Sequence, residues 1–289
     1  MLQQYIAGTD LATSIYLALK LKRPLLLEGE AGVGKTEVAK VLATVLNTNL
    51  IRLQCYEGLD VSHAVYEWNY ARQLIEIRVA ETRNTQDRDH KYRVRELFGP
   101  DFLIERPLLQ ALRNSGTYPP VLLIDELDRA DEEFEGYLLE LLSDFQVTIP
   151  EIGTIKATEP PAVIITSNRT RELHDALKRR CLYAWIDYPD FDKELRIVTT
   201  KVPGVSAALA EQVTRFVQEL RRVELYKVTG ISETLDWVAA LVALDQQELD
   251  SATIERTLGI VLKNQEDMRA MRADRIQEIL NRAKTPGTR

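Results

Sequence analysis

Residues 29–36 of the chain read Gly29-Glu30-Ala31-Gly32-Val33-Gly34-Lys35-Thr36. This stretch fits the pattern G-x-x-x-x-G-K-[ST], in which glycines let the backbone curl so that successive N–H groups converge on phosphate oxygens. The lysine is expected to bring its charge to the β- and γ-phosphates, and the threonine hydroxyl is expected to reach Mg²⁺. The stretch therefore predicts a site for a nucleoside triphosphate and its magnesium ion.

The residues on either side of this loop match the strand and helix that such a loop requires. An apolar run at 24–27 precedes it and begins with Pro24, which is tolerated at the first position of a strand. After the loop, one helix face carries Val38, Val41, Leu42, Val45 and Leu46. Strand, glycine-rich turn and helix in this order indicate nucleotide binding. The predicted nucleotide contacts are Gly29, Glu30, Ala31, Gly32, Val33, Gly34, Lys35, Thr36 and Glu37.

Further apolar runs predict the rest of the fold. Runs at 50–55, 121–124, 163–167 and 184–188 alternate with helical patterns, which is typical of a parallel sheet covered by helices on both faces. Beyond Pro189 only helical patterns remain, the last of which predicts one helix over 268–280. We therefore expect an α/β core at 1–190 and a helical lid domain at 191–289.

Two stretches interrupt this alternation. An insert near 56–105 contains the charged segment 82–96, whose mixed signs favour a solvated surface over a dedicated partner surface. Residues 147–157 alternate between apolar and polar side chains around Pro150 and Gly153, which predicts a hairpin.

Two predicted strands end in polar residues that could act on a bound nucleotide. The run 121–124 leads into Asp125 and Glu126, and the run 163–167 leads into Asn168. Beside the loop at 29–36, Asp125 would hold Mg²⁺ and Glu126 would act as base for the attacking water. Asn168 could hydrogen-bond the same water or the γ-phosphate. All of these residues are expected at the carboxyl ends of parallel strands, where open α/β sheets bind ligands.

The bulk composition restricts the class of protein. The chain has 289 residues, of which 45% are hydrophobic, and a formal net charge of −7. It contains no apolar run of membrane-span length and no signal-peptide pattern, so we expect a cytoplasmic protein with no membrane span. A general nucleic-acid binder would usually be basic, which makes that partner class less favoured.

These motifs together resemble an AAA+ ATPase. The segment Asp125-Glu126-Leu127-Asp128-Arg129-Ala130 is similar to the D-E-[IL]-[ND]-R-A signature of the MoxR branch. Ser167-Asn168, the segment 177–180 and Tyr188-Pro189 also fit that branch, and 231–237 is similar to the lid sequence of its CoxD-like members. The resemblance covers nearly the whole chain. It implies an AAA+ core with a C-terminal helical lid.

The resemblance also implies how the protein assembles and hydrolyses ATP. Family members form rings, commonly hexamers, with ATP at the subunit interfaces. Arg179 and Arg180 would then supply an arginine finger to a neighbour, with Arg180 as the first choice because it lies nearest the following strand; the alternative is a basic surface turn. A guanidinium beside the transferring phosphoryl group stabilises its negative charge.

In one respect the sequence departs from the wider AAA+ pattern. Many members carry an arginine early in a lid helix to sense the γ-phosphate, but the matching positions here, Ser232, Glu233, Thr234 and Leu235, include no arginine. Arg221 and Arg222 are the substitutes available nearby in the sequence.

By resemblance, the leading functional hypothesis is remodelling of a partner protein. The CoxD-like character implies maturation or metal-cofactor insertion in a client metalloenzyme, such as one of the carbon monoxide dehydrogenase type. It also implies cooperation with a von Willebrand A-domain protein.

Two other classes of function remain as alternatives. In a nucleic-acid motor, the hairpin at 147–157 would line the ring pore, but it contains one lysine, Lys156, and no aromatic residue for base stacking. A GTPase would normally carry N-K-x-D, which is absent, and a small-molecule kinase would not usually combine the Asp-Glu pair with an Asn-ended strand and a large lid.

Overall fold

A computed structural model describes residues 5–82, 96–113, 116 and 118–284 of the chain. Contacts divide the chain into two compact units. The nucleotide unit, as we name it, comprises Met1–Gly8, Gly29–Val38 and Ile186–Arg289, and the sheet unit comprises Thr9–Glu28 and Ala39–Trp185. The sequence predicts a domain boundary at residue 190, and that boundary stays a prediction.

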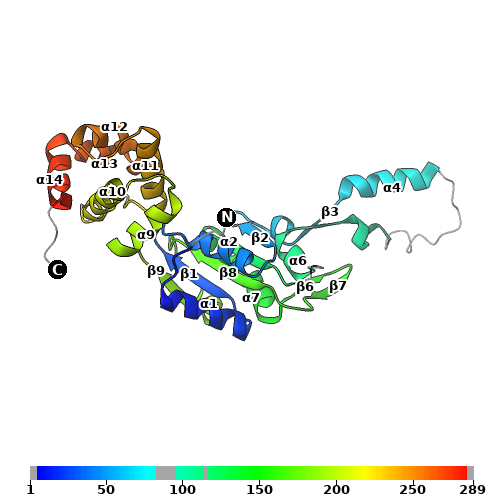
Figure 1. Cartoon of the computed structure of the whole chain (residues 1–289). Helices are drawn as coiled ribbons and strands as arrows, with labels where there is room; N and C mark the ends of the chain where they lie inside the picture. The colour runs from blue at the N-terminus through cyan, green and yellow to red at the C-terminus, as the bar shows by residue number, and fades with distance from the viewer. Residues whose placement is uncertain (1–4, 83–95, 114–115, 117, 285–289) are drawn as a thin grey trace. The chain divides into compact units, whose positions relative to one another are not determined.

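A five-stranded sheet with the order β2-β5-β8-β1-β9 forms the centre of the fold (Figure 1). Its strands are β1 (Leu25–Gly29), β2 (Leu50–Gln54), β5 (Val121–Asp125), β8 (Ala162–Ser167) and β9 (Leu182–Ile186). The pairs β2–β5, β5–β8 and β8–β1 are parallel. The carboxyl ends of these strands therefore share one edge of the sheet, as expected from the sequence.

Strand β9 lies two residues earlier than the predicted range of 184–188. Its first residue, Leu182, donates its backbone N–H to the carbonyl of Pro24 at 2.8 Å, which aligns it with the start of β1. Beyond Ile186 the N–H of Tyr188 bonds the Asp187 side chain, and Pro189 has no N–H to continue a ladder.

Helices cover both faces of the sheet, because alternate strand residues point to opposite sides. Leu122, Ile124 and Ile165 belong to a core that also includes residues of α6 (Pro107–Leu112) and α7 (Glu132–Asp144). On the opposite face, Ile164 lines a cavity together with residues of α1 (Thr9–Leu21) and α2 (Lys35–Val45). The predicted α/β architecture is confirmed.

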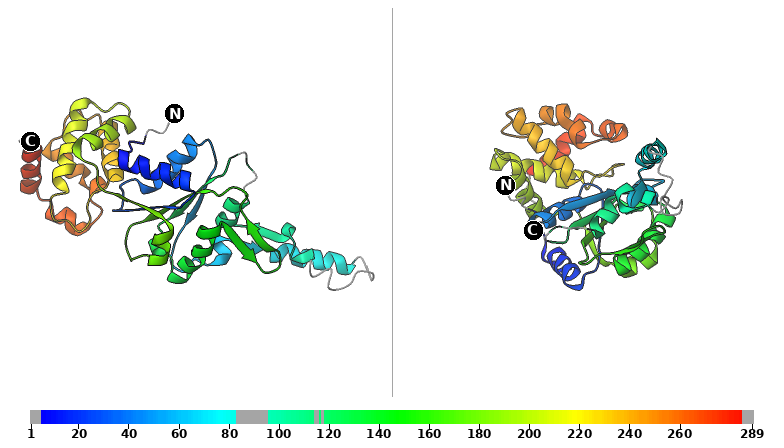
Figure 2. Two further views of the ribbon diagram at one scale, coloured as in Figure 1. Left: turned by 90° about the horizontal axis from the view of Figure 1, so that it is seen from below. Right: turned by 90° about the vertical axis from the view of Figure 1, so that its right-hand side faces the viewer.

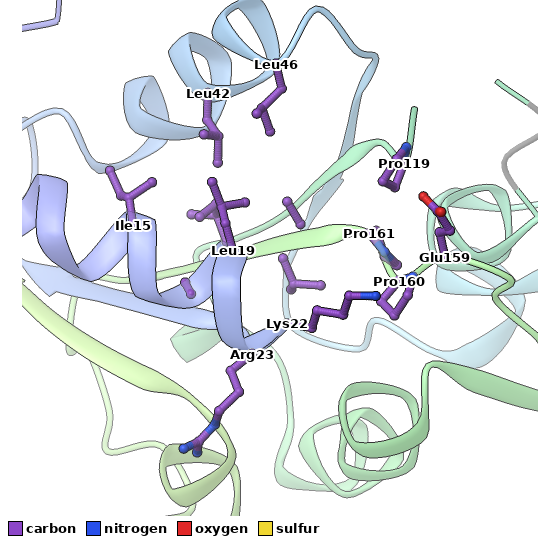
Figure 3. A pocket seen from close by; sticks show the side chains of 14 residues that line it. Ile15, Leu19, Lys22, Arg23, Leu42, Leu46, Pro119, Glu159, Pro160 and Pro161 are labelled. Atoms are coloured by element: carbon purple, nitrogen blue, oxygen red, sulfur yellow. The ribbon is translucent and has the colours of Figure 1, made fainter. Parts of the chain in front are cut away.

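The cavity on the second face has a volume of about 250 Å³. Figure 3 shows Ile15 and Leu19 of α1, Leu42 of α2 and Leu46 directly after α2 around it, with Lys22 and three prolines at its other side. Its lining residues include none of the candidate site residues named above, all of which the structure describes.

The expected insert and hairpin both appear as small sheets. The insert contains α3 (Val61–Ala64), α4 (Tyr70–Thr82), the 3-10 turn η1 (Pro100–Phe102) and an antiparallel pair of β3 (Tyr66–Trp68) with β4 (Leu103–Glu105). Trp68 is buried there against Phe98, with ring centroids 5.2 Å apart. Most of the charged segment 82–96 lies outside the described residues. The hairpin prediction is confirmed by β6 (Gln146–Ile149) and β7 (Gly153–Lys156), which pair antiparallel.

The C-terminal helices form a core of their own, seen as the yellow-to-red group in Figures 1 and 2. Phe216 and Trp237 are fully buried at its centre, with ring centroids 5.5 Å apart. The helices are α9 (Phe191–Lys201), α10 (Ala207–Leu220), α11 (Ile231–Ala243), α12 (Ser251–Val261), α13 (Gln265–Ala270) and α14 (Ala273–Lys284). Among the described residues, no helix is long and apolar enough to cross a membrane.

The single helix predicted over 268–280 is wrong. The chain breaks at Met271, whose N–H caps α13 by bonding the carbonyl of Asp267 at 3.1 Å, and α14 then begins at Ala273. Met271 and Ile276 are both buried in the same core, although five residues would separate them by about 140° on one continuous helix. The break allows both side chains to face that core.

A buried ion pair connects three elements of this helical group. Both oxygens of Glu194, whose side chain is fully buried, accept hydrogen bonds from the Arg221 guanidinium at 2.6 and 2.7 Å. Thr234 and Gln218 donate to the same carboxylate at 3.0 and 2.7 Å. The buried charges of Glu194 and Arg221 therefore compensate each other, and neighbouring side chains supply further hydrogen bonds.

We expect Glu194→Ala to destabilise the protein by about 3–5 kcal/mol, because it leaves the Arg221 charge buried without its partner. Urea unfolding followed by tryptophan fluorescence would measure the change. The matched control is Glu211→Ala, which breaks an exposed Arg215–Glu211 pair on α10 and should cost no more than about 0.5 kcal/mol. Equal effects of the two variants would contradict the prediction.

Candidate active site: a phosphate loop and an acidic strand edge

The candidate residues fall into two groups, one in each compact unit. The loop at 29–37 and the start of the lid belong to the nucleotide unit, whereas Asp125, Glu126, Asn168 and the arginine pair belong to the sheet unit.

The loop at 29–36 follows β1 directly and leads into α2, which begins at Lys35. A Cβ atom on Gly29 would lie 2.1 Å from the carbonyl oxygen of Ile186, so only glycine fits at the end of β1. The Lys35 ammonium is buried and donates to the carbonyls of Gly29 and Glu30 at 2.7 and 2.6 Å. The loop thus curls around the Lys35 ammonium, whose positive charge suits the binding of a phosphate.

The first helical turn of α2 carries Thr36 and Glu37. Glu37 pairs with Lys201 of α9 at 3.3 Å. Tyr5 belongs to the same unit, where burial and, to a smaller extent, the Glu37 charge raise the pKa of its hydroxyl to about 12. Thr36 directly follows Lys35, so its hydroxyl stands at the position where the motif requires a magnesium ligand.

The lid touches the phosphate loop through the backbone. The carbonyl of Gly32 accepts the N–H of Ile231, the first residue of α11, at 2.9 Å. Gly32 has φ +78°, and a Cβ on it would lie 3.1 Å from Cα of Gly230, so the two glycines allow this close approach.

Neither arginine that could substitute for the missing lid sensor is available in this conformation. The side chain of Arg221 is 8% exposed and is held by Glu194, while its Nε donates to the carbonyl of Thr229 at 2.8 Å. Arg222 is largely exposed and pairs with Glu219 at 2.7 Å. Both guanidinium groups are thus engaged within the helical group itself.

In the sheet unit, Asp125 ends β5 and is buried. Its Oδ1 accepts a hydrogen bond from the Thr166 hydroxyl at 2.6 Å, and its Oδ2 accepts two from the Arg52 guanidinium at 2.6 and 3.0 Å. Arg52, from the neighbouring strand β2, balances the buried charge, and its side chain is half exposed.

Glu126 follows Asp125 with a left-handed backbone, φ 55° and ψ 50°, and its N–H donates to the hydroxyl of Thr166 at 2.9 Å. Its carboxylate accepts hydrogen bonds from the side-chain amides of Asn168 at 3.3 Å and Gln54 at 3.1 Å. The guanidinium of Arg129 lies 3.1 Å from the same carboxylate. The structure thus brings together Asp125, Glu126 and Asn168, as the sequence led us to expect.

This arrangement agrees with comparisons to known proteins. A family model described as the AAA domain of the dynein-related subfamily matches residues 24–181. The chain belongs to this family. The matched range contains every candidate catalytic, nucleotide and metal residue predicted from the sequence.

Relatives of this AAA domain are distant but cover most of its length. An uncharacterized protein of Staphylococcus haemolyticus (strain JCSC1435) is 26% identical over 281 residues, covering 93% of this chain and 96% of the relative. The denitrification regulatory protein NirQ of Stutzerimonas stutzeri is 26% identical over 218 residues, covering 73% of this chain and 68% of NirQ.

A mutant of Thermotoga maritima RuvB is structurally similar, with a TM-score of 0.53 and 17% identity, over 92% of this chain and 74% of that chain. The similarity shows a shared fold. The expected AAA+ fold, a P-loop core with a helical C-terminal region, is confirmed.

The two candidate arginine fingers of this AAA domain lie at the end of α8 (Asp175–Arg180). Arg23 holds the end of this helix, because its guanidinium donates to the carbonyls of Arg179 at 2.7 Å and Arg180 at 3.2 Å. The Arg180 side chain donates to the hydroxyl of Ser143 at 2.6 Å and to the carbonyl of Ala176 at 3.0 Å. The Arg179 side chain is exposed.

Several side chains that contact Asp125 or Glu126 are not part of any motif that the sequence analysis identifies. Arg52 and Gln54 come from β2, where their spacing of two on one strand face was the available signal. Thr166 lies inside an apolar run, where the pattern predicts a strand and no polar role. Its hydroxyl connects Asp125 with the N–H of Glu126, a role that requires the register of β5 against β8.

Proposed function

We propose that this chain hydrolyses ATP with Mg²⁺ and uses the resulting shape change to remodel a partner protein. The observation that carries the ATPase proposal is the acidic group: a buried Asp125 and a Glu126 held by the Asn168 amide, at the edge of a sheet whose strand β1 leads into the phosphate loop. Such an edge is where open α/β sheets bind ligands.

The residues present suit a magnesium nucleotide. The backbone N–H groups at 29–37 and the Lys35 ammonium would bind the phosphates. Magnesium prefers carboxylate and hydroxyl oxygens, which Asp125 and Thr36 supply. When bound, the ion would neutralise charge that develops on the phosphates.

The remaining residues have roles that follow from their chemistry. Glu126 would accept a proton from the attacking water, and Asn168, whose amide already bonds Glu126, would orient that water or the γ-phosphate. By resemblance to ring-forming AAA+ proteins, Arg180 or Arg179 would act on the nucleotide of a neighbouring subunit in a homo-oligomeric ring, such as a hexamer.

The client and partner assignments rest on resemblance to the CoxD-like MoxR branch. We propose maturation or metal-cofactor insertion in a client metalloenzyme, together with a von Willebrand A-domain protein, for a protein in the cytoplasm. The relative named a denitrification regulatory protein is compatible with action on another enzyme system. The domain division at residue 190 is part of the same proposal.

A nucleic-acid motor is the second candidate, favoured only by the hairpin β6–β7. That hairpin, Gln146–Lys156, contributes one lysine and no aromatic side chain, and the chain carries a net charge of −7. An ATPase assay with and without DNA separates the two proposals. Measurable hydrolysis of ATP that DNA does not change supports remodelling, whereas strong stimulation by DNA favours the motor, and absence of hydrolysis removes both.

We expect Arg180→Ala to slow hydrolysis by about 10³- to 10⁵-fold while ATP still binds, because the transferring phosphoryl group loses a guanidinium. Arg179→Ala is the matched control and should have a smaller effect. Steady-state turnover and nucleotide binding would be measured on both variants.

Action across a subunit interface requires a further result. Rings mixed from Arg180→Ala and Glu126→Gln subunits should regain part of the activity, because some interfaces then combine an intact base with an intact arginine. Mixed rings that stay inactive would contradict action in trans, and a larger loss in Arg179→Ala would move the role to Arg179.

A further inference from the structure

Asp128 joins the loop after β5 to the loop after β8. It lies in the 3-10 turn η2 (Leu127–Arg129) and is 2% exposed. Its Oδ1 accepts the backbone N–H of Asn168 at 3.1 Å, and its Oδ2 accepts the N–H of Thr170 at 2.9 Å and the Thr170 hydroxyl at 2.7 Å. A carboxylate offers about four lone-pair sites. Three of those of Asp128 accept hydrogen bonds from the loop after β8.

The two loops joined by Asp128 both contain unfavourable backbone conformations. Glu126 has φ 55° and Arg169, directly after Asn168, has φ 56°. Non-glycine residues in the left-handed region cost free energy and persist only when the surrounding structure holds them. Asp128 follows Glu126 by two residues, and its carboxylate bonds the backbone N–H groups of the residues on both sides of Arg169.

This arrangement sets the position of the Asn168 side chain. The Asn168 amide donates to the Glu126 carboxylate at 3.3 Å, while the N–H of the same residue is bound to Asp128. Without Asp128, the backbone of Asn168 has no charged acceptor, and its amide can move relative to Glu126. Burial by itself would raise the pKa of Asp128, but the hydrogen bonds from Thr170 and Asn168 lower it below the usual value. The group therefore remains an ionised acceptor.

We propose that Asp128 is a positioning residue for ATP hydrolysis, which holds Asn168 against the catalytic base Glu126. The inference rests on the proposed function, because it assumes that Glu126 and Asn168 act on the attacking water. Asp128 itself acts only through Asn168. A purely structural role would affect stability and every function alike. The test must therefore separate a positioning role from a structural role.

The test is a double-mutant cycle on the full chain, with Asp128→Ala, Asn168→Ala and the double variant. Single-turnover and steady-state ATP hydrolysis would give kcat and KM, and thermal unfolding would give Tm. Asp128→Ala should lower kcat by about 10²-fold with little change in KM, because a small misplacement of a catalytic group has an effect of this size. In the Asn168→Ala background the same change should lower kcat by less than about threefold, since the two residues act as one unit.

Asp267→Ala is a matched control for the loss of a buried carboxylate. Asp267 of α13 is also buried and accepts the backbone N–H groups of Tyr226 and Lys227 at 2.7 and 3.1 Å. This variant should lower Tm and leave kcat unchanged. If Asp128→Ala lowers Tm by a similar amount and leaves kcat unchanged as well, the positioning role is wrong.

Two milder variants keep the test decisive if Asp128→Ala does not fold. Asp128→Asn retains an oxygen for the Asn168 N–H and should recover most of the lost kcat. Thr170→Val removes the hydroxyl contacts to the Asp128 carboxylate at 2.7 Å and to its backbone carbonyl at 3.3 Å but keeps the Thr170 N–H bond, and should give an intermediate kcat. If these substitutions lower kcat by the same factor in the wild-type and Asn168→Ala backgrounds, the inference is wrong.

The outcome can be told apart from failure of the proposed function. If the wild-type chain hydrolyses no ATP, or Glu126→Gln turns over normally, the ATPase proposal itself is wrong. If hydrolysis depends on Glu126 and Asn168 but not on Asp128, only the inference about Asp128 fails.

Discussion

A Lys35→Ala variant is expected to lose nucleotide binding. The ammonium is buried and bonds two carbonyls of its own loop, at 2.7 and 2.6 Å, so the loop and the side chain define one another's positions. Substitution removes the positive charge that would face the phosphates, and it also leaves the carbonyls of Gly29 and Glu30 without this donor. Truncation of one partner of a buried, hydrogen-bonded charge pair costs about 2–5 kcal/mol, or roughly 30-fold to several thousand-fold in Kd.

Titration with a fluorescent ATP analogue would measure this loss, with thermal unfolding as a check on folding. Lys40→Ala provides the matched control, because Lys40 is exposed five residues further along the same helix. Its affinity should stay within about twofold of wild type, as is usual for exposed substitutions. If Lys35→Ala binds as tightly as Lys40→Ala, the phosphate-binding role of Lys35 is wrong.

A Glu126→Gln variant should bind ATP but hydrolyse it about 10²- to 10⁴-fold more slowly, because an amide cannot take up the proton of the attacking water. Glutamine has the same shape as glutamate, and its oxygen can still accept a hydrogen bond from Gln54 or Asn168. The left-handed backbone of residue 126 is unchanged by this substitution. The variant should therefore retain bound ATP after desalting, which chromatography of the extracted nucleotide would detect.

Glu133→Gln serves as the control, since Glu133 is exposed in the first turn of α7 and has the same side chain. It should turn over ATP at the wild-type rate. Normal turnover in Glu126→Gln would show that another group is the base. The trapped variant has a second use, because a client held by the ATP-bound state would co-purify with it.

The elements predicted well are those whose apolar patterns are buried by immediate neighbours. Strands β5 and β8 match their predicted ranges to within one residue because they are buried apolar runs in a sheet covered on both faces. The prediction over 268–280 failed because tertiary packing of Met271 and Ile276 outweighed local helix preference. Likewise, the start of β9 depends on pairing with Pro24, which no local pattern encodes.

The motif residues of the candidate site could be predicted, but their supporting contacts could not. Asp125, Glu126 and Asn168 end apolar strands, and this position is visible in the sequence. The contacts of Arg52 and Asp128, by contrast, are set only when the sheet order places β2 beside β5 and β5 beside β8. Their roles depend on strand order and on burial. Both of these are properties of the folded chain.

The positions of the three tryptophans make the two compact units optically distinguishable. Trp237 is enclosed in the helical core, where its indole N–H bonds the Thr257 hydroxyl at 2.8 Å. Trp68 and Trp185 belong to the other unit, where Trp185 is 42% exposed and the Arg169 guanidinium lies over its ring. Chains that retain only one indole would therefore emit from one unit at a time. Their spectra during denaturation would reveal whether the lid melts together with the sheet or as a separate cooperative block.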